Sequence, residues 1–147
     1  MERAEATAQL LAAKEEKDLS FAEIAKSVGR HPVWTAAAIH GQAVMSAEEA
    51  DKLVDLLGLP AAVSVALQRY PMRGSLDEAV PTDPLIYRLY EIVLVYGTAM
   101  KGVIHEEFGD GIMSAIDFDM DITRVPDPKG DRVSITMTGK FLPYRKW

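Results

Sequence analysis

One segment, residues 84–107, constrains the fold of this chain more than any other. Asp83 supplies an N-cap and Pro84 a first-turn residue, and Gly109 marks the end, so the segment predicts one long helix. Apolar residues lie on every side of that helix, and a helix that is apolar all round is normally buried. We therefore expect the helix to be covered, and we expect other copies of the same chain to cover it.

Two charged residues, Arg88 and Glu91, interrupt the apolar stretch from Pro84 to Met100. Residues three apart share a face of a helix, so the two side chains can touch. One interpretation is a structural ion pair, because charges buried in proteins are usually paired. The other is functional: a hydrophobic replacement is often no less stable than a buried pair, and the forked donors of Arg suit small planar anions. The pattern alone leaves both interpretations open.

The residues after the long helix predict a β-hairpin. Apolar and acidic residues alternate over 115–122, which is the pattern of a half-buried strand. Residues 127–130, Asp-Pro-Lys-Gly, predict a turn, and the alternation resumes over 132–138. A lone two-stranded hairpin is only marginally stable in water, so it needs the helix or another chain to pack against. This is a first indication of an oligomer.

The connection between the helix and the hairpin reads Gly-Asp-Gly-Ile-Met-Ser over residues 109–114. Its two glycines allow a close backbone approach or a positive φ. Ser114 follows at the start of the predicted strand, where it can offer a hydroxyl and a backbone amide. Taken by itself the pattern is nonspecific, and a plain helix-to-strand turn is the simpler interpretation.

The first half of the chain predicts a series of short helices. Capping boxes at Ser20–Glu23 and Ser46–Glu49 begin two of them, and glycines end them. The order helix, glycine turn, helix over residues 20–41 is the pattern of a helix-turn-helix.

A connection rich in Pro, Gly and Ser follows at residues 71–80. We therefore predict a mainly α fold with a small β part. A helical bundle occupies residues 1–75, and a C-terminal α+β domain occupies residues 76–147.

The helix-turn-helix pattern raises the alternative of a DNA-binding regulator with a small-anion effector domain. Its second helix, residues 32–40, has almost no group that reads base edges. Residues 1–70 hold seven Lys or Arg against ten Asp or Glu, whereas phosphate binding needs the reverse. We therefore expect no nucleic-acid partner. A pure assembly scaffold is a third possibility, and the Arg88–Glu91 pair is the feature against it.

Composition excludes several classes of protein. The chain has no cysteine, so disulfides and thiolate metal sites are excluded. It also has no apolar run long enough for a membrane span or a signal peptide. The net charge of −6 belongs to an ordinary acidic globular protein. We expect a cytoplasmic protein without a membrane partner.

Several blocks of the sequence resemble the signature of the cyanase family. The blocks are residues 81–84, 87–88, 90–91, 96–97, 108–112 and 114–116. The similarity continues through residues 19–25 and 139–143, so it covers most of the chain, and it is most specific over 81–118. The resemblance implies a lyase that needs no metal or cofactor. Such an enzyme decomposes cyanate with bicarbonate as co-substrate, giving CO2 and carbamate, which then yields ammonia and a second CO2.

The resemblance also implies site residues and an assembly. The catalytic Arg, Glu and Ser of the family fall on Arg88, Glu91 and Ser114, with no departure at any of the three. Whether Glu91 orients Arg88 or relays a proton stays open, as does the physiological role, detoxification or nitrogen supply. The family pattern is a repressor-like helical bundle followed by a catalytic domain that interlocks into dimers. Five dimers form a homodecamer with active sites between subunits, so residues 76–147 are expected to serve both catalysis and oligomerisation.

Overall fold

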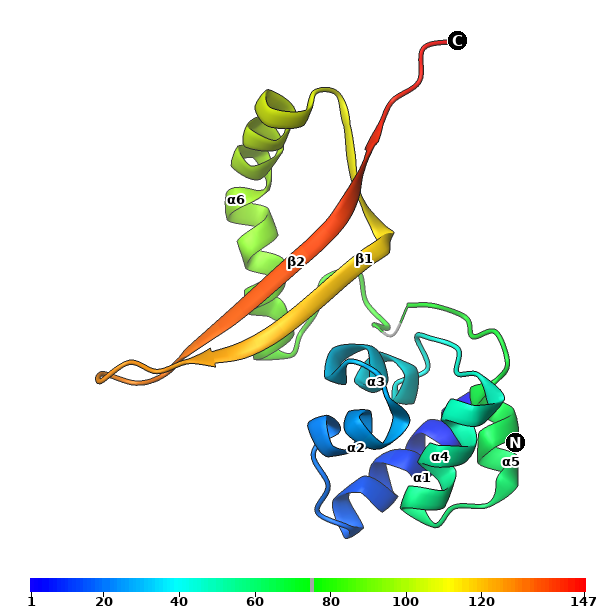
Figure 1. Ribbon diagram of the computed structural model, residues 1–147. Coiled ribbons are helices and arrows are strands. Elements are labelled where there is room, and N and C mark those ends of the chain that lie inside the picture. Colours follow the sequence, from blue (N-terminus) through cyan, green and yellow to red (C-terminus); the bar gives the residue numbers. More distant parts are fainter. Residues whose placement is uncertain (75) are drawn as a thin grey trace. The chain divides into compact units, whose positions relative to one another are not determined.

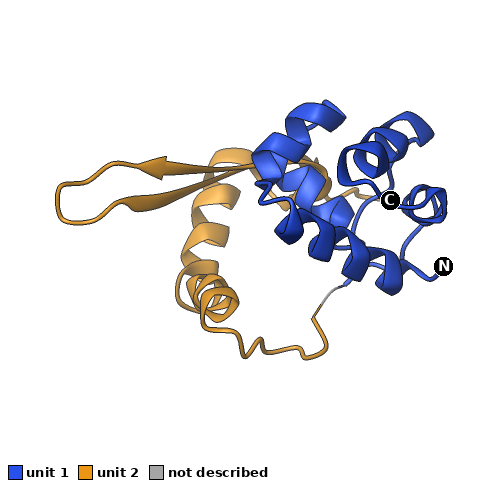
Figure 2. Ribbon diagram, turned by 90° about the horizontal axis from the view of Figure 1, so that it is seen from below, with its two compact units in different colours: residues 1–75 blue, residues 76–147 orange. Residues whose placement is uncertain are grey.

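The computed structural model describes residues 1–74 and 76–147. The chain forms two compact units, residues 1–75 and 76–147, which Figure 2 shows in blue and orange. Helices predominate, and the two strands of the described chain lie in the second unit. The predicted fold class, mainly α with a small β part, is therefore confirmed.

Helices make up the first unit (Figure 1). They are α1 (Arg3–Glu16), α2 (Phe21–Val28), α3 (Pro32–Ile39), α4 (Ala47–Leu57) and α5 (Ala61–Leu67). Their apolar faces meet in one contiguous core of buried side chains. The largest fully buried apolar side chains are those of Leu10, Ile24, Ile39, Met45, Leu53, Val63 and Leu67.

Local capping fixes where two of these helices start and stop. The Ser20 hydroxyl accepts a hydrogen bond from the Glu23 amide, and the Glu23 carboxylate accepts one from the Ser20 amide. The same reciprocal arrangement joins Ser46 and Glu49 at the start of α4. Both helices end at a glycine in the left-handed conformation. The capping boxes and the glycine stops predicted from the sequence are confirmed.

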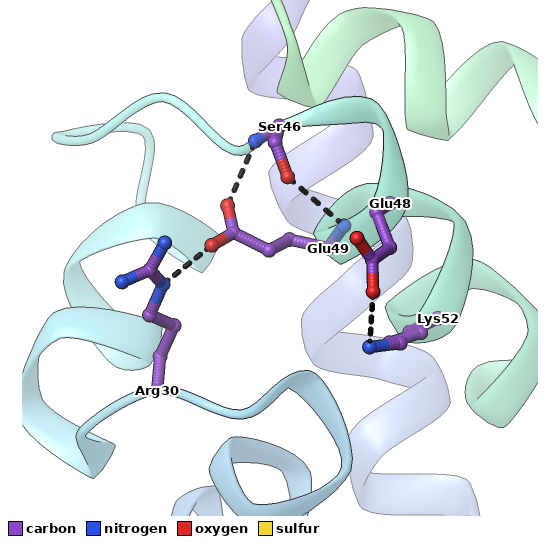
Figure 3. A network of polar contacts seen from close by, with 5 residues as sticks. All are labelled: Arg30, Ser46, Glu48, Glu49 and Lys52. Carbon is purple, nitrogen blue, oxygen red and sulfur yellow. Dashed lines mark hydrogen bonds and ion pairs between the residues drawn. The ribbon is translucent and has the colours of Figure 1, made fainter.

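Glu49 also belongs to a polar network at the start of α4 (Figure 3). Its carboxylate accepts from the Ser46 amide at 2.8 Å and pairs with the Arg30 guanidinium, which lies between α2 and α3. Burial opposes ionisation of this carboxyl, but the hydrogen bonds from Ser46 and Arg30 outweigh it and hold the pKa of Glu49 below its usual value. Lys52 pairs separately with Glu48 at 2.7 Å. The network joins α4 to the α2–α3 turn.

The second unit consists of one long helix and one hairpin (Figure 1). Its elements are α6 (Pro84–Phe108), β1 (Gly111–Val125) and β2 (Arg132–Pro143). The strands pair antiparallel and are joined by a turn in which the Gly130 amide donates to the Asp127 carbonyl at 3.0 Å. Both strands run beyond the predicted 115–122 and 132–138, because backbone pairing continues past the apolar alternation on which the prediction rested.

The start of α6 is set by its first turn. The Asp83 side chain accepts hydrogen bonds from the amides of Leu85 and Ile86, both at 2.9 Å, and Pro84 occupies the first helical position. The helix ends at Phe108, one residue beyond the predicted end at 107, and Gly109 is its C-cap. The predicted N-cap and the predicted glycine stop are both confirmed.

The second unit has no hydrophobic core within a single chain. Among its described residues only Pro81, Gly111 and Ser114 are buried, and no residue of α6 is. The apolar side chains of the helix and of the hairpin are exposed instead, which is far more apolar surface than a stable soluble monomer normally presents. That α6 is buried between subunits stays a prediction.

Candidate functional site

Arg88 and Glu91 lie on the same face of α6 and touch, as their spacing predicts. The Arg88 Nη1 atom lies 3.1 Å from the Glu91 Oε2 atom. The two side chains are 64% and 47% exposed in the single chain, so the pair is open to solvent and to small solutes. In the second unit, one guanidinium is therefore oriented by one carboxylate at an accessible surface of the long helix.

Two tyrosines flank the pair on the same helix. The Arg88 guanidinium lies over the Tyr87 ring, with its central carbon 5.5 Å from the ring centroid. The Tyr87 and Tyr90 rings are tilted against each other with centroids 6.0 Å apart. An Arg side chain held by a carboxylate and an aromatic face loses less freedom when it binds an anion, because much of its ordering has already occurred.

Ser114 sits where the hairpin loses its regular register. Met113 pairs with Phe141 and Phe118 pairs with Gly139, so β1 has four residues, 114–117, where β2 has Lys140 alone. These four residues form an arch in β1, which we call the Ser114 arch. Such irregularities redirect side chains and are common beside functional sites.

The Ser114 hydroxyl holds the arch together from inside. Its oxygen accepts hydrogen bonds from the amides of Ile116 and Asp117, both at 3.0 Å, and these are amides in the stretch where the pairing is interrupted. The Ser114 residue is 6% exposed. A serine hydroxyl has two lone pairs and one proton, so these two bonds occupy its acceptor capacity and leave the proton to donate. Toward a ligand, Ser114 is therefore disposed to act as a donor, and the hydrogen bonds it accepts polarise the O–H further.

The sequence pattern did not reveal the Ser114 arch. A strand over residues 115–122 was predicted and is confirmed as part of β1, but nothing in the pattern indicated that its pairing with β2 is interrupted between Met113 and Phe118. The alternation of residue types continues through 115–122 although the backbone pairing does not. Glycine at 139, opposite the end of the arch, is the one sequence signal that could have indicated a close approach of the two strands.

The three predicted residues are not joined within one chain. Among the described residues, no hydrogen bond or ion pair links Ser114 to Arg88 or to Glu91. Within one chain, the Arg88–Glu91 pair on α6 and the Ser114 hydroxyl on β1 are thus two separate groups.

Two further features of the described residues bear on the kind of site present. No group of three His, Asp or Glu residues is placed so that it could hold a metal ion. Among the helices of residues 1–74 and 76–147, none combines the length and the apolarity that crossing a membrane requires.

Comparisons with known proteins identify both units. Residues 3–71 match the family model "Cyanate hydratase, N-terminal", and residues 78–146 match the model "Cyanate lyase C-terminal domain". Both models describe parts of one kind of enzyme. The chain belongs to the cyanase family.

Relatives match along nearly the whole length. A cyanate hydratase of Synechococcus sp. (strain CC9311) is 60% identical over 141 residues, which is 96% of this chain and 94% of the relative. One of Thiobacillus denitrificans is 56% identical over 147 residues, covering 100% of each chain. The crystal structure of a cyanase from T. urticae superposes with a TM-score of 0.84 at 40% identity, covering 95% of this chain and 97% of that one.

Proposed function

We propose that this protein decomposes cyanate with bicarbonate as co-substrate, and that Arg88, Glu91 and Ser114 carry the reaction. The observation that carries the proposal is the 60% identity, over 96% of the chain, to a protein named cyanate hydratase. In the proposed reaction a bicarbonate oxygen attacks the cyanate carbon, and the cyanate nitrogen takes up the bicarbonate proton and one further proton from solvent. The bond between the bicarbonate carbon and the bridging oxygen then breaks, which releases CO2 and leaves carbamate. Carbamate then breaks down unaided to ammonia and a second CO2.

The charges of the two substrates explain why such a site needs a guanidinium. Cyanate and bicarbonate are both anions, and two unit charges 4 Å apart repel by about 1 kcal/mol in water and about 4 kcal/mol at an effective dielectric constant of about 20. Arg88 offers a fixed positive charge with forked donors that match a planar anion. Its exposure and its contacts with Glu91 and Tyr87 support this role.

Ser114 is proposed to stabilise the negative charge that develops on the joined substrates. Both of its observed hydrogen bonds use the hydroxyl as acceptor, so the proton is the group it can offer to an anion. Positioned donors of this kind act on the transition state without further reorganisation. Holding a poor nucleophile against a small electrophile supplies much of the remaining rate enhancement.

Glu91 is proposed to orient Arg88, with which it is paired at 3.1 Å. A proton relay is the other role open to a carboxylate at this place. The Glu91→Gln variant separates the two roles. An orienting role of Glu91 predicts a higher KM, because the side-chain amide oxygen of the variant still accepts a hydrogen bond from Arg88 but holds it more weakly. A relay predicts a lower kcat with a changed pH profile.

We further propose that the active sites form between subunits of a homodecamer built from five dimers. The second unit supports this, because α6 has no buried residue and the apolar surface of helix and hairpin is uncovered in one chain. The separation of Ser114 from the Arg88–Glu91 pair within one chain supports it as well. Such an assembly would bring Ser114 of one subunit to Arg88 of another. The cytoplasmic location stays a prediction.

Cyanate-dependent release of ammonia from the purified protein tests the proposed function. We expect ammonia to form in proportion to the cyanate added, and we expect Arg88→Ala protein prepared in the same way to form almost none. A wild-type protein that assembles normally and releases no ammonia from cyanate and bicarbonate would refute the proposal. Equal rates in both proteins would remove Arg88 from the mechanism.

A further inference from the structure

We infer that Gly139 is a positioning residue for Ser114: it lets β2 approach the Ser114 arch closely enough to fix where the Ser114 hydroxyl points. The inference rests on the proposed catalytic role of Ser114 and extends it to a residue on the other strand. Gly139 pairs with Phe118, the residue at which regular pairing resumes after the arch.

Space, not backbone conformation, requires glycine at this position, because Gly139 does not adopt a positive φ. A Cβ atom built on Gly139 would lie 2.3 Å from the Ser114 carbonyl oxygen and 2.7 Å from the Met113 Cγ atom. Real Cβ atoms essentially never come within 3.0 Å of such neighbours. The Met113 side chain can turn away, but the carbonyl belongs to the backbone and moves only if the arch moves.

A displacement of the arch acts directly on the Ser114 hydroxyl. The carbonyl that Gly139 approaches and the hydroxyl that is proposed to donate belong to the same residue. That hydroxyl is fixed by two amides, Ile116 and Asp117, inside the arch. An added methyl group requires the Ser114 carbonyl to move from 2.3 Å to at least 3.0 Å away. That movement shifts the backbone of the arch, and with it the Ser114 hydroxyl and the two amides that bind it. Misplacement by about 1 Å in an active site can cost on the order of 10²-fold in rate.

The kinetic test is a double-mutant cycle on the full chain. Gly139→Ala should lower kcat on the order of 10²-fold, similar to the loss of a positioned donor, and should change KM far less. Ser114→Ala combined with Gly139→Ala should be no slower than Ser114→Ala alone, because the second change acts through a group already removed. Additive losses, or a Gly139→Ala protein with full kcat, would overturn the inference.

A second readout does not depend on turnover. The chain has no cysteine, so Ser114→Cys introduces a single thiol whose alkylation rate by iodoacetamide reports the position and exposure of side chain 114. Adding Gly139→Ala should change that rate several-fold. If Ser114→Ala retains full activity, the proposed catalytic role of Ser114 fails, while the thiol still decides whether Gly139 positions side chain 114.

Gly111→Ala provides the matched control in the same hairpin. Its Cβ would lie 2.4 Å from the Leu142 carbonyl oxygen, a comparable clash that does not involve Ser114. Combined with Ser114→Cys, it should leave the alkylation rate nearly unchanged. An equal change of rate in both glycine variants would mean general strain of the hairpin and would overturn the inference. A Gly139→Ala chain that fails to assemble while Gly111→Ala assembles would also overturn it, because Gly139 would then be needed for folding itself.

Discussion

Replacing Arg88 by alanine distinguishes a structural ion pair from a catalytic one, because the two roles predict free-energy changes of very different size. The Arg88–Glu91 contact spans 3.1 Å between side chains that are 64% and 47% exposed. An exposed pair three residues apart on a helix contributes only about 0.3–0.5 kcal/mol to stability. Loss of a group that stabilises transition-state charge costs about 2.7–4 kcal/mol in activation free energy, on the order of 10²–10³-fold in rate.

Urea unfolding and cyanate-dependent ammonia release, measured on the same preparations, give both quantities. Arg88→Ala should unfold at nearly the wild-type urea concentration and turn over almost no cyanate. Arg88→Lys should also perform poorly, because an ammonium group keeps the charge but cannot make the forked contact.

Lys52→Ala is the control for breaking an exposed helical ion pair. Lys52 and Glu48 pair at 2.7 Å with side chains 47% and 78% exposed, in the first unit and outside the proposed site. This variant should show a similarly small change in stability and full turnover. The reasoning would be refuted if Arg88→Ala lost several kcal/mol of stability and its remaining activity merely followed the folded fraction.

Three further predictions address the shared site, the first unit and pH. Co-expressed Arg88→Ala and Ser114→Ala chains should form mixed oligomers that recover a minority of wild-type activity. Confirmed mixed oligomers without any activity would mean that each site is built within one chain. The protein should not shift duplex DNA at physiological salt in a gel assay, because its first unit is acidic, and nanomolar, sequence-selective binding would restore the regulator hypothesis. Because the folded-state pKa of Glu49 is lowered, its carboxylate stabilises the fold above its usual pKa of 4.5, and this contribution is lost as the pH falls through the lowered value. Glu49→Gln should therefore lower the free energy of unfolding by about 1 kcal/mol at neutral pH. An equal loss of unfolding free energy, measured with urea at strongly acidic pH, would contradict this.

Features that depend on neighbouring residues could be predicted from the sequence. The capping box at Ser46 and Glu49 and the contact of Arg88 with Glu91 both join residues three apart, so the spacing alone indicates them. The N-cap at Asp83 is equally local. Such patterns locate the ends of α4 and α6 and one half of the candidate site.

Features that join distant residues could not be predicted in this way. The Arg3 guanidinium donates to the carbonyls of Ala38, Ala43 and Ala66, at 2.6, 3.0 and 3.0 Å, and no spacing in the sequence indicates this. The Ser114 arch was missed for the same reason, because its existence depends on how β1 pairs with β2. The alternation of residue types does not indicate that the pairing of β1 with β2 is interrupted.

The central claim is that bicarbonate is a substrate of this protein, and labelled bicarbonate tests it most directly. Purified protein would be supplied with cyanate and carbon-labelled bicarbonate, and the release of labelled CO2 would be followed together with ammonia. The proposed reaction predicts labelled CO2 in step with ammonia, and it predicts that cyanate decomposition stalls when bicarbonate and dissolved CO2 are removed. Cyanate decomposition at the full rate in water without bicarbonate would contradict the claim.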